Sequence, residues 1–461
     1  MKNIPAIAIF DIGKTNKKFF LFDEQYKIVL ERTVQFEETT DEDGDSCDDV
    51  NQLSTWVLET LADALQLKKF HIKAVNFSAY GASFVYIDEK GKVIAPLYNY
   101  LKPFDEELSK KFYENYGGEG KISVETASPV LGNLNSGMQL YSIKHQKPAI
   151  FKQAKYALHL PQYLNYLVTK QPCSDITSIG CHTQLWNFRS NAYHTWVTEE
   201  EIDAKLAPVL PSNEATPVSF DEKEIYAGTG LHDSSAALIP YLACFTEPFV
   251  LISTGTWCIT LNPFNNIPLT TEELQKDCLC YMEYHGRPVK ASRLFAGSEH
   301  EIQTKKLAAH FGEPNDHYKK VKFNSNIISK LQKEESLTKN LEDGLQKSVF
   351  AQRDLSSFKS YEEAYHRLIM DIMIEQTASS ELVLKGTQVT RIFVDGGFGN
   401  NPIYMNLLAA AFPDLEVYAA SVAQATAVGA ALAIHKFWND QSIPGDMIEM
   451  KYYSVVSEQD V

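Results

Sequence analysis

Two stretches of the chain share one pattern of apolar and polar positions. Near the start, an apolar run ends at Asp11, a polar turn follows at residues 13–16, and a second apolar run covers residues 19–22. Residues 249–261 repeat this order, with a Ser-Thr-Gly-Thr turn between an apolar strand and a β-branched strand. Both patterns predict β-hairpins with polar tips. The repetition indicates a chain made of two similar halves.

The hairpin tips carry groups that suit the phosphate tail of a nucleotide. Glycine at a tip lets backbone N–H groups approach an anion, and Asp11 offers oxygen ligands to a divalent cation. An ordinary glycine-containing turn is the alternative for each tip taken alone. Because the tip occurs once in each half, we favour a nucleotide held between the halves. The residues expected to contact its phosphates are Gly13, Lys14, Thr15, Asn16, Gly255 and Thr256.

A third glycine-rich stretch, residues 391–402, runs from a buried-looking strand into a Gly-Gly turn and then into a helix. Such a turn lets a ligand lie against the backbone. We therefore expect Gly396, Gly397 and Asn400 to line the nucleoside part of the site. Further on, residues 421–424 read as a capping box that opens a helix rich in alanine and glycine.

The order of elements in the first half predicts its fold class. After the first hairpin come a third apolar strand at residues 28–36 and an amphipathic helix at residues 51–67. Residues 74–87 then form two strands joined by a Gly-Ala bend. Long antiparallel strands before the first helix differ from the order of a dinucleotide-binding fold. They are typical of a ribonuclease-H-like domain.

An acidic residue stands where a flexible segment meets a helix. Gly-Thr-Gly at residues 228–230 leads to Asp233, and Ser-Ser-Ala-Ala follows it at the start of an apolar helix. Asp233 is a natural helix N-cap, which is its structural interpretation. An acid at a helix start also stays ionised and can accept a proton from a hydroxyl. The two roles are compatible in one residue.

Four motifs, taken together and in order, resemble the FGGY family of carbohydrate kinases in the actin-like ATPase superfamily. They are Asp11-Ile-Gly-Lys-Thr, Gly230-Leu-His-Asp-Ser-Ser-Ala, Ser253-Thr-Gly-Thr-Trp and Asp395-Gly-Gly-Phe-Gly-Asn. The resemblance covers nearly the whole chain. It implies an α/β fold of two actin-like (ribonuclease-H-like) domains, each a mixed sheet flanked by helices, with an ATP and sugar cleft between them. We place the domains at residues 1–244 and 245–461.

The resemblance also implies roles for individual residues. ATP and Mg²⁺ are the implied cofactors, with Mg²⁺ near Asp11 and Asp233. Asp233 matches the general base of the family. The sugar is expected to contact the bend at residues 80–82 and a later polar segment; the residues concerned are Tyr80, Gly81, Ala82, His182 and Asp233. Tyr80 and His182 each have a structural alternative, as a half-buried strand tyrosine and as a structural histidine.

The bend bears on the choice of sugar. Xylulose kinases commonly carry Met-His-Gly there, whereas this chain has Ala79-Tyr80-Gly81. The Gly-x-His-Asp-Ser-x-Ala context is more similar to the rhamnulose and fuculose kinases than to the glycerol kinases. We therefore expect a 6-deoxy-ketohexose, L-rhamnulose or L-fuculose, with xylulose and ribulose as alternatives. A non-sugar actin-like ATPase is the alternative of a different class. A sugar-sensing regulator is a third, although no DNA-binding extension is visible.

Composition narrows the partners of the chain. A length of 461 residues suits two domains of roughly 200 residues, and the net charge of −16 argues against a nucleic-acid surface. No apolar run approaches the ~20 residues of a membrane span, and the start enters a strand directly, so we expect no signal peptide and no membrane partner. Seven scattered cysteines do not form a disulfide framework. We predict a cytoplasmic protein, with a homodimer as the candidate assembly.

Further segments receive predictions from composition and periodicity. Residues 37–49 hold eight acidic side chains without EF-hand spacing and are expected to form a solvated loop. Residues 117–137 are expected to be a loop, and residues 148–168 and 305–354 to be helical. Residues 361–384 predict a long core helix. This helix lacks the Glu-Gly pair that many members of the family carry near the nucleotide.

Overall fold

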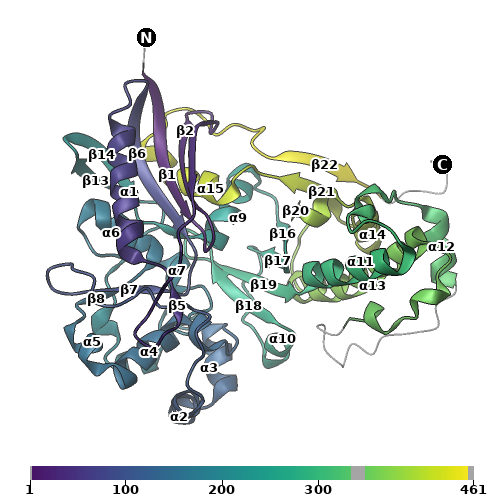
Figure 1. Ribbon diagram of the computed structural model, residues 1–461, viewed down its shortest axis with the longest axis horizontal. Coiled ribbons are helices and arrows are strands. Elements are labelled where there is room, and N and C mark those ends of the chain that lie inside the picture. Colours follow the sequence, from purple (N-terminus) through teal and green to yellow (C-terminus); the bar gives the residue numbers. More distant parts are fainter. Residues whose placement is uncertain (1–2, 334–347, 455–461) are drawn as a thin grey trace.

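The computed structural model describes residues 3–333 and 348–454 (Figure 1). Within these residues each half of the sequence forms a seven-stranded sheet. The first sheet consists of β1 (Ile4–Ile12), β2 (Lys17–Asp23), β3 (Ile28–Val34), β6 (Phe70–Ala79), β13 (Ala215–Phe220), β14 (Lys223–Gly228) and β15 (Leu231–His232). Its order is β13-β14-β6-β1-β2-β3, and β15 also pairs with β6.

The second sheet has the order β18-β19-β17-β16-β20-β21-β22. Its strands are β16 (Phe249–Thr254), β17 (Cys258–Asn262), β18 (Cys278–Met282), β19 (Pro288–Leu294), β20 (Arg391–Gly396), β21 (Glu416–Ser421) and β22 (Glu449–Tyr453). Both sheets contain parallel and antiparallel pairs, so each is mixed, as the sequence predicts.

Helices cover the faces of both sheets (Figure 1). Those of the first half are α1 (Val50–Leu65), α2 (Glu106–Tyr116), α3 (Glu119–Thr126), α4 (Ser136–Gln146), α5 (Pro148–Gln153), α6 (Leu160–Thr169), α7 (Ile176–Ile179), α8 (Thr195–Glu199) and α9 (Asp233–Cys244). Those of the second half are α10 (Thr271–Gln275), α11 (Ala296–Phe311), α12 (Ser325–Lys333), α13 (Tyr361–Leu384), α14 (Pro402–Ala411) and α15 (Ala425–Ala433). Short strands pair β4 (Thr39–Thr40) with β5 (Ser46–Cys47), β7 (Phe84–Ile87) with β8 (Tyr156–His159), β9 (Ser174–Asp175) with β12 (Val209–Leu210), and β10 (Trp186–Asn187) with β11 (Ala192–Tyr193).

The two predicted hairpins are present. Residues 6–12 of β1 pair antiparallel with residues 17–23 of β2, and residues 251–254 of β16 pair antiparallel with residues 258–261 of β17. The first strand of each hairpin also pairs in parallel with a later strand, β1 with β6 and β16 with β20. Because parallel strands end at the same edge of a sheet, each polar tip lies beside the end of that later strand.

Alternate residues of β1 face two different cores. Ile7 and Ile9 are fully buried in the cluster that contains α9 and α15. Ala8 and Phe10 are fully buried in the cluster that contains α1 and α6. Side chains on successive strand residues point to opposite faces, so this strand, with both faces covered, consists almost entirely of apolar residues. Its apolar run is the signal that the sequence analysis used.

Helices α9 and α15 lie between the two sheets (Figure 1). One hydrophobic cluster joins them to Ile7 of the first sheet and to Phe393 of the second. Although α15 lies between β21 and β22 of the second sheet in sequence, it packs against β1 and β6 as well as against α9. The helices touch at Gly429, where an added Cβ would lie 1.8 Å from the carbonyl oxygen of Ala236. The small residues of α15 therefore permit a close helix–helix crossing.

The predicted capping box at residues 421–424 is wrong. Ser421 is the last residue of β21, where it pairs with Glu449 of β22. Helix α15 begins later, at Ala425, and its N-cap Gln424 has a φ of 55° and makes no side-chain capping bond. The ladder with β22 thus extends the strand through the serine that the pattern assigned to a helix.

Two predicted boundaries are also wrong. Residues 148–168 hold β8 between α5 and α6, because residues 156–159 pair with β7. Residues 117–137 contain α3 instead of loop only. Residues 305–354 contain the end of α11 and the whole of α12, while residues 334–347 lie outside the described part. The long core helix is confirmed as α13.

The acidic segment at residues 37–49 is not simply solvated. Asp41 and Asp48 are buried, with exposed fractions of 7% and 8%. Lys102 forms ion pairs with the carboxylates of Asp41 and Asp43 at 2.6 and 2.8 Å, and Lys147 pairs with Asp43 at 2.7 Å. Lysines from outside the segment therefore fix its path.

Candidate active site

The second hairpin tip and the Gly-Gly turn meet at a cavity of about 620 Å³. Three residues predicted to contact the nucleotide, Gly255, Gly397 and Asn400, line it. The predicted Gly396 packs beneath them with a φ of 93°, and an added Cβ there would lie 2.0 Å from the carbonyl oxygen of Thr254. A cavity of this size accommodates a small-molecule ligand. Its aromatic and histidine lining comes from His300, Tyr318, Tyr365 and Phe398.

The first tip is closed by a bond from the backbone N–H of Gly13 to the carbonyl oxygen of Asn16, at 2.9 Å. Thr15 is exposed there, as is Thr256 at the second tip. Both threonines are accessible to a ligand. A Cβ added to Gly255 would meet nothing within 4 Å, so the second tip also leaves its backbone open on that side.

Lys14 is directed at the acidic segment. Its Nζ lies 2.7 Å from Oδ2 of Asp48 and 2.8 Å from Oε1 of Glu38. Two carboxylates therefore compensate its charge. A second lysine, Lys18, stands nearer to the acidic residues of the cleft: its Nζ donates to Oε1 of Gln424 at 3.1 Å, and its charge acts on the carboxylate of Asp11.

The two predicted metal ligands, Asp11 and Asp233, lie near enough for the charge of Asp233 to act on Asp11. Burial raises the pKa of Asp11 to about 6, against the hydrogen bond from Thr426, and the nearby charge of Asp233 raises it further. Thr426 Oγ1 donates to Oδ2 of Asp11 at 2.7 Å. Thr426 and Asp233 line one cavity of about 230 Å³, together with Asp395 and Tyr281. The repulsion that Asp233 exerts on Asp11 would be relieved by a cation bound near both carboxylates.

Asp233 is the first residue of α9, and the N-cap is its neighbour His232. The carboxylate accepts the backbone N–H of Ser234 at 2.6 Å, and its side chain is 34% exposed. Burial raises the pKa of Asp233 to about 6, partly offset by the hydrogen bonds from Ser234. A carboxylate with a raised pKa that a ligand can still reach is suited to accept a proton near neutral pH.

The predicted sugar bend packs directly on His232. An added Cβ on Gly81 would lie 2.3 Å from two atoms of the His232 ring, so only glycine fits there. Ala82 has a φ of 61° and is buried, and Gln139 Nε2 donates to its carbonyl oxygen. The hydroxyl of Tyr80 donates to Oδ2 of Asp48 at 2.8 Å. The bend is thus fixed on several sides, beside the residue that precedes Asp233.

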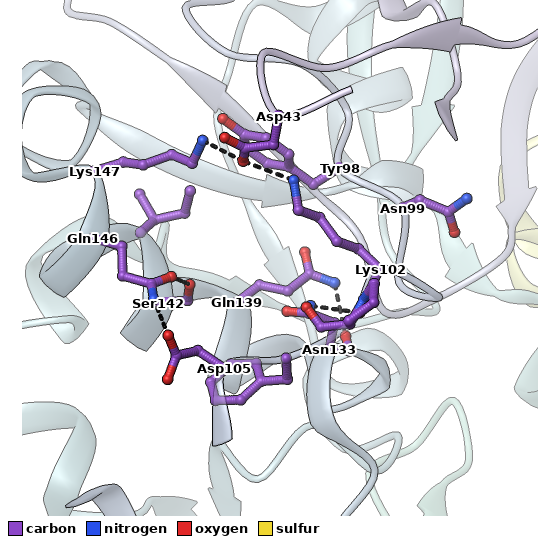
Figure 2. A pocket seen from close by; sticks show the side chains of 13 residues that line it. Asp43, Tyr98, Asn99, Lys102, Asp105, Asn133, Gln139, Ser142, Gln146 and Lys147 are labelled. Atoms are coloured by element: carbon purple, nitrogen blue, oxygen red, sulfur yellow. Dashed lines mark hydrogen bonds and ion pairs between the residues drawn. The ribbon is translucent and has the colours of Figure 1, made fainter. Parts of the chain in front are cut away.

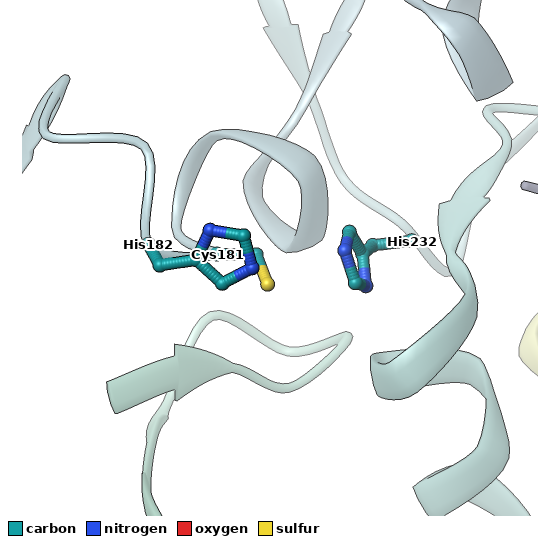
Figure 3. Close-up of side chains that lie close together, drawn as sticks. All are labelled: Cys181, His182 and His232. Atoms are coloured by element: carbon teal, nitrogen blue, oxygen red, sulfur yellow. The ribbon is translucent and has the colours of Figure 1, made fainter. Parts of the chain in front are cut away.

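His182 and His232 face each other beside Cys181 (Figure 3). The sulfur of Cys181 and one ring nitrogen from each histidine lie within 4.8 Å of one another. Nδ1 of His182 lies 3.2 Å from the carbonyl oxygen of Leu134, and Nδ1 of His232 lies 3.2 Å from the backbone nitrogen of Ser234.

The carbonyl oxygen of Leu134 makes Nδ1 of His182 a donor, so Nε2 of His182 is an acceptor. Nδ1 of His232 lies 3.2 Å from both the N–H of Ser234 and Oδ1 of Asp233, so the contacts allow the proton of this ring on either nitrogen. Burial lowers the pKa of His182 to about 3 and that of His232 to about 4, so both rings are neutral at neutral pH. A hydroxyl group both donates and accepts, and it can bond to both Nε2 atoms when His232 carries its proton on Nε2.

Several residues of this region were not predicted from the sequence. His232 and Asp395 lie within the four motifs, so the neighbouring motif residues were the available signal. Lys18 adjoins the first tip, where strand alternation separates it from the buried Lys17. Thr426 had no local signal, because its contact with Asp11 joins opposite ends of the chain.

The sequence profile of the N-terminal domain of the FGGY family of carbohydrate kinases matches residues 6–236. The profile described as carbohydrate kinase FGGY, C-terminal domain, matches residues 246–442. The chain belongs to the FGGY family of carbohydrate kinases. This membership confirms the resemblance drawn from the four motifs. Among the residues that the structure describes, no helix is both long enough and apolar enough to cross a bilayer.

Other FGGY proteins resemble this one over part or all of its length. A rhamnulokinase from Halalkalibacterium halodurans is 24% identical over 274 residues, which is 56% of either chain. This FGGY chain thus spans about half the length of that curated relative. A carbohydrate kinase from Novosphingobium aromaticivorans superposes with a TM-score of 0.80 at 20% identity, covering 99% of this chain and 96% of the other.

A ligand-bound xylulose kinase from Lactobacillus acidophilus superposes with a TM-score of 0.74 at 16% identity, covering 97% of this FGGY chain and 93% of that one. Likeness at such low identity concerns the fold. It confirms the predicted α/β architecture of two sheets flanked by helices.

Proposed function

We propose that the protein is an ATP-dependent sugar kinase that transfers the γ-phosphate of ATP to a primary hydroxyl of a 6-deoxy-ketohexose, L-rhamnulose or L-fuculose. The observation that carries the proposal is the position of Asp233. Its reachable carboxylate has a pKa raised to about 6, its charge acts on the carboxylate of Asp11, and it follows His232, on which the glycine bend is packed.

Asp233 is the general base in this proposal. Its carboxylate accepts the proton of the sugar hydroxyl while the hydroxyl oxygen attacks the γ-phosphorus and the bond to the β,γ-bridging oxygen breaks. ADP leaves with the bridging oxygen, and the sugar keeps the phosphoryl group. Phosphoryl transfer requires mainly in-line positioning and charge neutralisation, and the residues of the cleft supply both.

Backbone N–H groups at the hairpin tips and the ammonium of Lys18 would face the phosphates. Lys14 contributes less than its sequence position suggests, since Asp48 and Glu38 already compensate its charge. Mg²⁺ would be held by Asp11 and Asp233, and its charge would offset the burial that raises the pKa of both carboxyl groups. When bound, it would neutralise charge on the transferred phosphoryl group. Gly396, Gly397 and Asn400 would line the adenosine pocket.

The sugar would lie beside the glycine bend and the histidine pair, which pack on each other. One hydroxyl can accept from Nε2 of His232 and donate to Nε2 of His182. The Gly230-Leu-His-Asp-Ser-Ser-Ala motif and the similarity to a rhamnulokinase support the 6-deoxy-ketohexoses over xylulose and ribulose. We retain the cytoplasm as the predicted location and a homodimer as the predicted assembly.

A coupled assay of ADP release with Mg-ATP, run against a panel of ketoses, polyols and 6-deoxy sugars, tests the proposal. We expect strong release with L-rhamnulose or L-fuculose and weak release with xylulose and ribulose. A preference for a pentulose would overturn the substrate assignment. ADP release that no sugar accelerates would favour a non-sugar actin-like ATPase.

A further inference from the structure

One buried carboxylate contacts both the tip of the first hairpin and the bend that is expected to contact the sugar. Residues 13–16 are called the nucleotide tip below, and residues 80–82 are called the sugar bend. Asp48 lies at the end of the acidic segment and is 8% exposed. Its carboxylate accepts from Nζ of Lys14 at 2.7 Å, from Nζ of Lys17 at 2.9 Å and from the hydroxyl of Tyr80 at 2.8 Å. Burial alone would raise the pKa of Asp48, but these hydrogen bonds hold it below its ordinary value. Asp48 is therefore a charged anchor with three donors.

Two of these donors control the nucleotide tip. Lys14 lies in the turn itself. The ammonium of Lys17, which is 1% exposed, also donates to the carbonyl oxygen of Lys14 at 2.8 Å. Asp48 thus holds both the side chain of Lys14 and, through Lys17, the backbone of the turn. Charge-assisted hydrogen bonds of this kind are among the strongest in proteins, and burial raises the cost of breaking them.

The third donor belongs to the sugar bend. Tyr80, which is 7% exposed, immediately precedes Gly81, which packs against the His232 ring. A shift of the Asp48 carboxylate would therefore displace Tyr80 and change the packing of the bend on His232. A shift of the bend would act on the nucleotide tip by the same route.

The remainder of the acidic segment is fastened elsewhere. Figure 2 shows Lys102 and Lys147 directed at Asp43, the same residue with which they form ion pairs at 2.8 and 2.7 Å. These lysines line one cavity together with residues of α4. With one part of the segment fixed in this way, Asp48 has a defined position from which to hold the tip and the bend. Asp43 also pairs with two lysines, but its side chain is 46% exposed and none of these pairs involves the tip or the bend. It is the control for loss of a carboxylate in the same segment.

We propose that Asp48 is a positioning residue that couples the two substrate sites, so that the nucleotide and the sugar each bind more tightly in the presence of the other. This inference rests on the proposed function, because it requires both ligands. The coupling is reciprocal: a nucleotide that orders the tip orders the bend, and a sugar that orders the bend orders the tip.

The test compares Asp48→Asn and Asp43→Asn with the wild type. Dissociation constants of a non-hydrolysable Mg-ATP analogue are measured by calorimetry with and without a saturating concentration of the sugar that the ADP-release panel identifies, and the reverse titration is also made. In the wild type and in Asp43→Asn, we expect each ligand to lower the dissociation constant of the other about 5-fold or more. In Asp48→Asn the factor should fall to about 1. The melting temperature of each variant is recorded as the measure of a purely structural effect.

Tyr80→Phe is the second variant, because it removes one donor and leaves the ion pairs of Asp48 in place. Tyr80→Phe should lose the coupling, while the Mg-ATP analogue alone binds as tightly as it does to the wild type. If Asp48→Asn does not fold, Tyr80→Phe still tests the inference. Coupling retained in Asp48→Asn or Tyr80→Phe, or independent binding in an active wild type, would overturn the inference and leave the proposed function standing. A wild type that no sugar activates would overturn the proposed function, and the coupling with it.

Discussion

Asp233 is held in a state that costs stability. A carboxylate whose pKa is raised from 3.8 to about 6 by burial is less favourably ionised in the folded protein than in water. The hydrogen bonds that Ser234 donates to the carboxylate only partly offset the effect of burial on its pKa. Such strain at a partly buried position that a ligand can still reach is typical of a functional group.

The first prediction concerns turnover. Asp233→Asn should lower kcat by roughly 10²–10⁴ because the amide cannot accept the hydroxyl proton, while the affinity for ATP measured without Mg²⁺ changes little. Steady-state kinetics and nucleotide titration measure the two quantities. Asp63→Asn, which alters an exposed carboxylate of α1, is the control. Turnover within a few-fold of the wild type would remove Asp233 from the chemistry.

The second prediction concerns pH. The wild-type kcat should fall as pH drops through about 6, where Asp233 becomes protonated. The stability changes in the opposite direction. Because the folded state holds this proton more tightly than the unfolded state does, the contribution of Asp233 to the free energy of unfolding falls as the pH rises from about 4 to about 6. Asp233→Asn should therefore melt higher than the wild type at pH 8 without Mg²⁺, and the gap should close near pH 4.

Sequence patterns predicted which residue types gather at the site better than they predicted the partners of each residue. Gly255, Gly397 and Asn400 do meet at one cavity. Lys14 and Lys18 carry the same charge close together in sequence, yet Lys14 pairs with Asp48 and Lys18 acts on Asp11. The path of the acidic segment determines which lysine pairs with its carboxylates. No periodicity in the sequence predicts that path.

At the scale of elements, the contact between α9 and α15 depends on the absence of a side chain. Gly429→Ala would place a Cβ 1.8 Å from the carbonyl oxygen of Ala236, which is backbone and cannot rotate away. The third prediction is a loss of about 1–3 kcal/mol in the free energy of unfolding, measured by denaturant titration. Gly120→Ala, in α3 with nothing within 4 Å of the added Cβ, should be neutral or stabilising by up to about 1 kcal/mol. Equal effects of both substitutions would contradict a tight crossing.

Elements with strong periodicity were predicted well, and short ones were not. Helix α13 has the predicted bounds, because its apolar residues recur over many turns. Strand β8 has only four residues and is specified by its partner β7. Ser421 could open a helix by its local sequence, but pairing with β22 places it in a strand. Tertiary pairing outweighs local propensity in both cases.

At the scale of the whole molecule, the duplicated hairpin predicted two similar halves, and each half forms a seven-stranded sheet. The proposed function implies motion, because it requires ligand contacts from both halves. The fourth prediction is that Mg-ATP analogue and sugar together reduce the radius of gyration, because closure of the halves excludes water from the transfer. Small-angle X-ray scattering measures it, with each ligand alone as the control. An unchanged radius would contradict closure.

The position of α15 has a consequence for how the chain is made. The ribosome releases the first sheet long before residues 425–433 exist, yet Ile7 and Ile9 need that helix as a cover. Until α15 is made, the nascent first half therefore presents an incomplete apolar face, the kind of surface that chaperones bind. Translation that stops before α15 yields a product with this face uncovered, so protection of this face from aggregation depends on the synthesis of α15.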